Sequence, residues 1–296
     1  MNGAANINDC TGGYFHHRKY ELEQTGGCFD ANKFFLRGMG YKYKLFPIER
    51  VILSEIHAEQ FLNSTYYRKN DCFVYVAVNN LSRWVGSDPK TVSEYINGLV
   101  KKGLLIKKES RGRLPAGYRI ASDKVLEAMT EYGKTFPEET PKLNGQMEDV
   151  AYTGNCESVK NNYFDHKEYG LIKTGGFYKA SRFFLRAVTE QHELSPIERV
   201  ILSEIHVEQY LDKYVNHRDE PVSIKIDDFI FWTGAHRRAV IKALNTLVGY
   251  GLLIKKESRG RLPAGYRIAS DKVLEAMAEY GRKHPEEIPK SKDKPP

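Results

Sequence analysis

The chain has little of what marks metal-binding, secreted or membrane-spanning proteins. Its 296 residues include only four cysteines, and none of these stands in a CxxC or Cys/His ligand spacing, which argues against a structural zinc site and a disulfide framework. No apolar run approaches the roughly 18 residues that a membrane helix requires. The first residues also lack the basic start and apolar middle of a signal peptide. We therefore expect a cytoplasmic globular protein without contact to a membrane.

Catalytic patterns are scarce as well. Neither a Gly-rich phosphate loop, nor a cluster of carboxylates, nor a Ser/His/Asp order occurs in both halves of the chain. Gly133-Lys134-Thr135 resembles the end of a P-loop, but Ala128 stands where that motif requires a glycine. These absences predict a protein that is not an enzyme and that binds no cofactor and no metal ion.

An internal repeat dominates what is present. The segment GLLIKKESRGRLPAGYRIASDKVLEAM occurs at 103–129 and again, unchanged, at 251–277, and PIERVILSEIHAEQFL at 47–62 returns as PIERVILSEIHVEQYL at 196–211. A period of about 149 residues is too long for a solenoid and indicates a duplicated domain. We predict an N-terminal tail (1–13), a first domain (14–133), a linker (134–162), a second domain (163–281) and a disordered tail (282–296).

The order of elements is predicted to be the same in both copies. An extended aromatic stretch around Phe34-Phe35 or Phe183-Phe184 precedes an amphipathic helix, which starts at Pro196 in the second copy with Ser195 as its cap. A short strand follows, clearest at 222–226, then a short helix that ends at Gly86 or Gly234, and a longer one that ends at Gly103 or Gly251. Two strands joined by SRGRLPAG and a helix capped by Ser122 and closed by Gly133 complete the unit. The fold class is α+β, mainly α.

Within this order, LSRWVGSDPKTVSEYINGLVKKGLLIKKE and FIFWTGAHRRAVIKALNTLVGYGLLIKKE resemble the helix-turn-helix of bacterial, plasmid and phage DNA-binding proteins. With the hairpin that follows, the resemblance implies two tandem winged helix-turn-helix domains. The helix before them, SPIERVILSEI, makes each unit similar to the DNA-binding domains of plasmid and phage replication initiators.

This resemblance implies that the second helix of each motif enters the major groove and meets base edges. The side chains left outward after removal of the apolar stripe are Lys90, Thr91, Ser93, Glu94 and Asn97 in the first copy, and Arg237, Arg238, Ile241, Lys242 and Asn245 in the second. Because the two sets differ in charge and in hydrogen-bonding groups, we expect the two copies to recognise different base pairs.

Positive charge gathers in the repeated hairpin. The net charge of the chain is +7, and residues 107–119 alone hold five basic residues and one acidic residue, as do 255–267. The residues expected to contact phosphates or the minor groove are Lys107, Lys108, Arg111 and Arg113, and Lys255, Lys256, Arg259 and Arg261. The identity of the two hairpins has two explanations, a common role on the DNA backbone or a recent duplication.

The sequence thus predicts a nucleoid-associated protein that binds double-stranded DNA sequence-specifically, as a replication initiator or transcriptional regulator of a plasmid, phage or other mobile element. The alternative is a winged-helix adaptor that binds proteins in a nucleoprotein assembly. The aromatic N-terminal segment of each repeat is expected either to cover its own domain or to mediate self-association. A flexible linker of this length spans roughly 30 Å, close to the separation of half-sites one helical turn apart, and allows direct or inverted half-sites.

Overall fold

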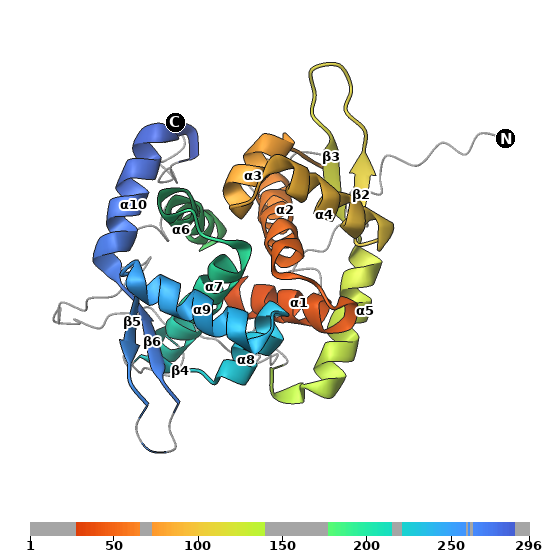
Figure 1. Ribbon diagram of the computed structural model, residues 1–296. Helices are drawn as coiled ribbons and strands as arrows, with labels where there is room; N and C mark the ends of the chain where they lie inside the picture. The colour runs from red at the N-terminus through yellow and green to blue at the C-terminus, as the bar shows by residue number, and fades with distance from the viewer. Residues whose placement is uncertain are drawn as a thin grey trace, which may run out of the picture.

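The described part of the chain is mainly helical. The computed structural model describes residues 28–65, 73–139, 177–214, 221–258, 260 and 263–287. These residues form ten α-helices, two short 3₁₀ turns and two three-stranded antiparallel sheets (Figure 1). The first copy comprises α1 (Cys28–Tyr43), α2 (Pro47–Thr65), β1 (Val74–Tyr75), α3 (Val78–Val85), α4 (Pro89–Lys101), β2 (Leu105–Lys108), β3 (Gly117–Ile120), α5 (Ser122–Thr135) and η4 (Pro137–Glu139).

The second copy repeats this order element by element. It comprises α6 (Phe177–His192), α7 (Pro196–Tyr214), β4 (Val222–Ser223), α8 (Ile226–Thr233), α9 (Arg237–Gly249), β5 (Leu253–Lys256), β6 (Gly265–Ile268), α10 (Ser270–Lys283) and η6 (Pro285–Glu287). The strand orders are β1-β3-β2 and β4-β6-β5, so the strand before the helix pair joins the edge of the hairpin that follows it. The helices and the two small sheets confirm the mainly helical α+β class. Each copy centres on a cluster of buried apolar side chains, and Val200 of the second copy joins that of the first.

The helix pairs α3–α4 and α8–α9 lie where the sequence predicts them, although α4 ends at Lys101 and α9 at Gly249, each two residues before the predicted glycine. Gly86 and Gly234 end the first helix of each pair with φ of 72° and 70°, a left-handed conformation that favours glycine. The Asp88 carboxylate accepts a hydrogen bond from the Thr91 N–H at 2.9 Å, and the His236 ring caps α9 in the same way. These side-chain caps start α4 at Pro89 and α9 at Arg237.

Four expectations need correction. The aromatic segments are not extended: Phe35 and Phe184 lie on the helices α1 and α6, and both are fully buried, because each shares a helix face with an apolar residue four positions on. The strand expected over 222–226 ends at Ser223, since Ile226 already belongs to α8. Ser122 does not cap α5; Ala121 holds that position, and its side chain makes no cap.

The fourth correction concerns where each copy ends. Gly133 does not close α5, which continues to Thr135 and is followed by η4, and the second copy likewise extends through η6 to Glu287. Ordered structure therefore extends six residues past each predicted end, into the predicted linker and the predicted disordered tail. The reason is local, because Tyr132 and Tyr280 donate hydrogen bonds to Glu139 and Glu287 at 2.6 and 2.7 Å and draw the chain back.

The two copies pack directly against each other. Helix α1 contacts α7 and α8, α6 contacts α2 and α3, and α2 contacts α7. The sequence had led us to expect that the reach of the linker sets the distance between the copies. The direct contacts set it instead. The contacts of α1 with α7 and α8 have their counterparts in those of α6 with α2 and α3. At the level of helices, the two copies are therefore related in the way that subunits of a symmetric dimer are.

Two arginines cross this interface reciprocally. The Arg37 guanidinium lies 3.7 Å from the centre of the Trp232 ring, and Arg186 lies 3.3 Å from that of Trp84. Each arginine also reaches a buried glutamate of the other copy, Glu204 at 2.7 Å for Arg37 and Glu55 at 2.6 Å for Arg186. Such stacking and pairing suits the planar guanidinium.

The pKa values of these arginines are set mainly by carboxylates of the other copy. Burial alone would lower the pKa of Arg37, but the carboxylates of Glu204, Glu208 and Glu139 raise it above the ordinary arginine value. The pKa of Arg186 is raised in the same way, against its burial, by Glu55, Glu59 and Glu287. Both side chains stay charged while only 2% exposed, so each copy depends on carboxylates of the other.

Removal of one buried partner tests this interface. Arg186→Ala leaves the 2%-exposed carboxylate of Glu55 with one cation fewer, so we expect the free energy of unfolding in urea to fall by about 3–5 kcal/mol. Lys272→Ala, which removes an exposed pair with Glu275, serves as the matched control and is expected to leave the unfolding curve unchanged. Equal effects of the two substitutions would contradict this description.

Candidate nucleic-acid interface

Helix α4 presents one side to the core of the first copy and the other to solvent. Val92, Ile96 and Leu99 are buried, which fixes the rotation of the helix and turns the predicted contact residues outward. Lys90, Glu94 and Asn97 are exposed, and Thr91 and Ser93 are half-buried. The predicted set therefore lies along one accessible side of α4.

Helix α9 is more open and more basic. All five predicted residues, Arg237, Arg238, Ile241, Lys242 and Asn245, are exposed. The Arg237 guanidinium donates to the Asp227 carboxylate at 2.9 Å, but the two side chains are 62% and 79% exposed. Since exposed pairs of this kind contribute little free energy, Arg237 remains available to an external anion.

The β2–β3 hairpin carries its two arginines at its tip. Arg111 and Leu114 close the turn with backbone hydrogen bonds of 3.2 and 3.0 Å in the two directions, and Gly112 has the positive φ of 58° that this tight turn needs. Arg111 and Arg113 are exposed. The tip therefore projects from the protein and is not folded back on it.

The hairpin lysines differ in how far they are held by the protein. Lys108 donates to the Tyr75 hydroxyl at 2.7 Å and lies near the Phe73 ring, so it is directed toward its own domain. Lys107 and Lys255 each pair with the exposed glutamate two residues on, at 3.0 Å. Lys255 and Lys256 are exposed. Arg259 and Arg261 lie outside the described residues.

A groove brings the predicted helix and hairpin residues together in the first copy. It has a volume of about 330 Å³ and lies between α4 and the β2–β3 hairpin. Ser93 and Asn97 line it from the helix, and Lys107 lines it from the hairpin. Groups predicted to contact bases and groups predicted to contact phosphates thus share one concave surface.

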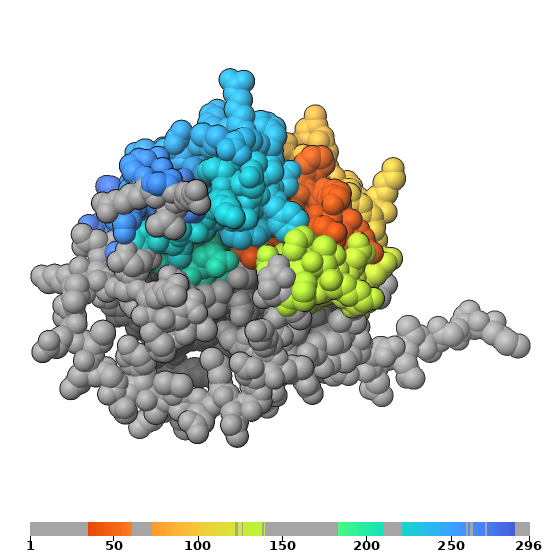
Figure 2. All heavy atoms as spheres, turned by 90° about the horizontal axis from the view of Figure 1, so that it is seen from below, coloured from red at the N-terminus to blue at the C-terminus, as the bar shows by residue number. Residues whose placement is uncertain are grey.

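The two exposed helices lie on the same side of the molecule. In Figure 1, α4 and α9 both lie toward the viewer, and the two hairpins point to opposite ends. Seen from below in Figure 2, the gold α3–α4 segment and the blue α9 segment stand along one edge. The turns that lead into both helices touch the other copy, because Gly86 lies against the Leu194 carbonyl and Gly234 against that of Leu45. The interface therefore fixes the spacing of α4 and α9.

The arginines and glutamates of the interface were missed from the sequence. Arg37 and Arg186 lie in the shared FFLR motif, and Glu55 and Glu204 in the shared SEIH motif. A charged residue beside apolar residues in a stretch that both copies share is the sequence signal that could have indicated these buried ion pairs. His57 and His206 of the same SEIH motif are buried at 1% and 3% exposure.

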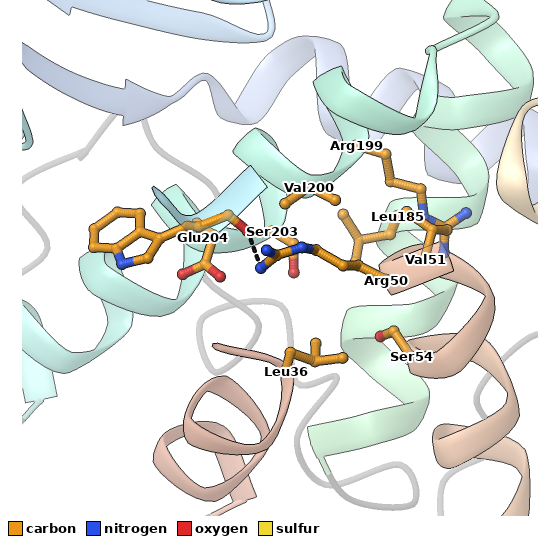
Figure 3. A pocket seen from close by; sticks show the side chains of 10 residues that line it. Leu36, Arg50, Val51, Ser54, Leu185, Arg199, Val200, Ser203 and Glu204 are labelled. Carbon is orange, nitrogen blue, oxygen red and sulfur yellow. Dashed lines mark hydrogen bonds between the residues drawn. The ribbon is translucent and has the colours of Figure 1, made fainter. Parts of the chain in front are cut away.

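A small cavity lies at the centre of this interface (Figure 3). Its volume is about 30 Å³, enough for a water molecule but not for a cofactor. Burial lowers the pKa of Arg50, which lines the cavity, to about 10. Its guanidinium donates to the Trp232 and Leu45 carbonyls. The cavity thus belongs to the packing of the two copies.

One group of side chains has the composition of a metal site. The ligand atoms of His284, Glu286 and Glu287 lie within 4.8 Å of one another. The Glu287 carboxylate, however, already accepts from Arg186 at 2.9 Å and Arg83 at 3.0 Å. Two arginines neutralise the charge that would attract a cation, so the group is a poor metal site.

Comparison with known proteins identifies no family for this chain. No protein-family model matches the chain, and no curated protein sequence is significantly similar to it. Among the described helices, none has the length and apolar character needed to cross a bilayer.

Proposed function

We propose that the protein binds double-stranded DNA sequence-specifically through two tandem winged helix-turn-helix domains. In this proposal α4 and α9 are the recognition helices that enter the major groove, and the β2–β3 and β5–β6 hairpins are wings that contact the backbone or the minor groove. The observation that carries it is the groove in which Ser93 and Asn97 of α4 face Lys107 of the wing. A winged helix on DNA needs this combination of a polar helix and a cationic hairpin.

The arrangement of the copies extends the proposal to the DNA site. Because the interface is reciprocal and both recognition helices lie on one face, one chain acts as a covalent pseudo-dimer. Half-sites bound in this way are inverted with respect to each other. The exposed side chains of α4 and α9 differ, so the two half-sites have different sequences. We assign the protein to the origin or operator of a plasmid, phage or other mobile element, as initiator or regulator.

The salt dependence of binding tests this function. A duplex is first selected from a random-site library, and its affinity is then measured by fluorescence anisotropy between 50 and 200 mM salt. With about six phosphate contacts from the wings, affinity falls by about 1,000-fold over this range. Binding that hardly changes with salt would instead favour a winged-helix adaptor whose target is a protein.

The division of labour between helix and wing gives a second test. Arg111→Ala with Arg113→Ala is expected to weaken all duplexes by a similar factor, because phosphate contacts carry no sequence information. Arg237→Ala or Arg238→Ala is expected to relax the preference at one base pair, by about 1–3 kcal/mol for a bidentate contact. Selection from the random library with each variant distinguishes the two effects, and the reverse pattern would exchange the proposed roles.

A further inference from the structure

The interface between the copies has two outer junctions that are equivalent by the repeat but opposite in chemistry. At the first, which we call the aromatic junction, Phe231 of α8 packs on Tyr41, Tyr132 and Phe136 of the first copy, with ring centres 6.0, 6.2 and 5.3 Å away. This junction is an apolar cluster in which Tyr41 and Phe136 also meet edge to face at 5.5 Å.

At the second, which we call the polar junction, Arg83 of α3 meets the second copy. Its guanidinium lies 3.1 Å from His284 Nδ1, 3.0 Å from the Glu287 carboxylate and 3.8 Å from that of Glu190. His284 Nε2 in turn lies 3.0 Å from a Glu190 oxygen. This junction is therefore a half-buried network of charged and hydrogen-bonding groups.

The repeat aligns these residues one for one. Tyr41 corresponds to Glu190, Phe136 to His284, and Arg83 to Phe231. Between these junctions the arginines and their rings are the same in both copies, as for Arg37 and Arg186 or Trp84 and Trp232, although Gly40 corresponds to Thr189. At the junctions, three aligned positions thus differ between the copies. At each junction, two of these positions belong to one copy and the third to the other.

We propose that these three exchanges make the interface heterotypic, so that the first copy pairs with the second and not with another first copy. If two first copies paired, Arg83 of each would face Tyr41 and Phe136 and lose Glu190 and His284. If two second copies paired, Phe231 would face Glu190 and His284, and Glu190 would lose Arg83 and keep only Lys283 of its own copy, 3.8 Å away.

The preference for the heterotypic pairing follows from a comparison of two heterotypic pairs with one pair of each homotypic kind. Two heterotypic pairs contain two aromatic and two polar junctions. One pair of each homotypic kind contains two junctions in which Arg83 meets the aromatic cluster and two in which Phe231 meets the charged network. A ring cannot replace the hydrogen bonds of a half-buried carboxylate, and specificity commonly rests on such mismatches in the wrong complex. An arginine can still lie over the Tyr41 ring, but this restores nothing to Glu190. The inference concerns the interface alone and does not depend on DNA binding.

An exchange of the two crossing residues in the full chain tests the proposal. Arg83→Phe combined with Phe231→Arg makes each copy match itself and mismatch the other. The wild-type chain is expected to run at its own mass of 34.0 kDa, and the exchanged chain at about twice that mass, measured by light scattering after size exclusion. An exchanged chain that stays at the wild-type mass would overturn the proposal.

A cleavable version identifies which copies pair. A protease site is placed in the segment 140–176 of each full chain, the folded protein is cut, and native mass spectrometry records the complexes. Wild-type fragments are expected as a 1:1 complex of the two copies, and the exchanged chain is expected to lose this complex in favour of two homotypic ones. A 1:1 complex that persists in the exchanged chain would contradict the heterotypic code.

Two further variants keep the proposal testable if the exchanged chain does not fold. Adding Tyr41→Glu, Phe136→His, Glu190→Tyr and His284→Phe to it transposes both junctions, and the 1:1 complex is expected to return. In a separate wild-type background, Arg83→Phe with Glu190→Tyr and His284→Phe makes both junctions aromatic. Its cut fragments are expected to redistribute into a mixture of homotypic and 1:1 complexes, and an unmixed 1:1 complex would refute the proposal.

Discussion

The structure depends on two buried arginines, one from each copy of the repeat, and each extends into the other copy. Arg37 covers the Trp232 ring and pairs with Glu204, while Arg186 covers Trp84 and pairs with Glu55. A buried charge is tolerated only when it is paired and hydrogen-bonded. Because these partners lie across the interface, neither copy satisfies its own arginine alone, and the two copies form one body.

This constraint determines how the candidate surface is displayed. Gly86 and Gly234, which lead into α4 and α9, lie against backbone carbonyls of the opposite copy, so the orientation of each exposed helix is tied to the interface. A linker of any length would leave this spacing unchanged. In the proposed function the interface therefore does what dimerisation does for single-copy DNA-binding proteins, while the duplication lets the two recognition surfaces differ.

Local signals predicted most of the fold, and the interface was the part that they could not predict. The glycines at 86 and 234 and the apolar stripe of α4 each act within a few residues, and the elements they predict are present. The outward side of α9 follows from the same periodicity. By contrast, Arg37 and Glu204 are far apart in the chain, and nothing near either one indicates a partner. Phe35 was misjudged for a related reason, since an aromatic pair alone does not distinguish a helix from an extended segment.

The central claim is that one chain holds the two proposed recognition helices in a fixed relation. The dependence of DNA affinity on the spacing of the two half-sites tests this claim most directly. A selected duplex is compared with versions in which about 5 base pairs, half a helical turn, are inserted between or removed from the half-sites. A fixed pseudo-dimer binds the altered duplexes no more tightly than a duplex with one half-site. Equal affinity for all spacings would show that the copies move independently and would contradict the account.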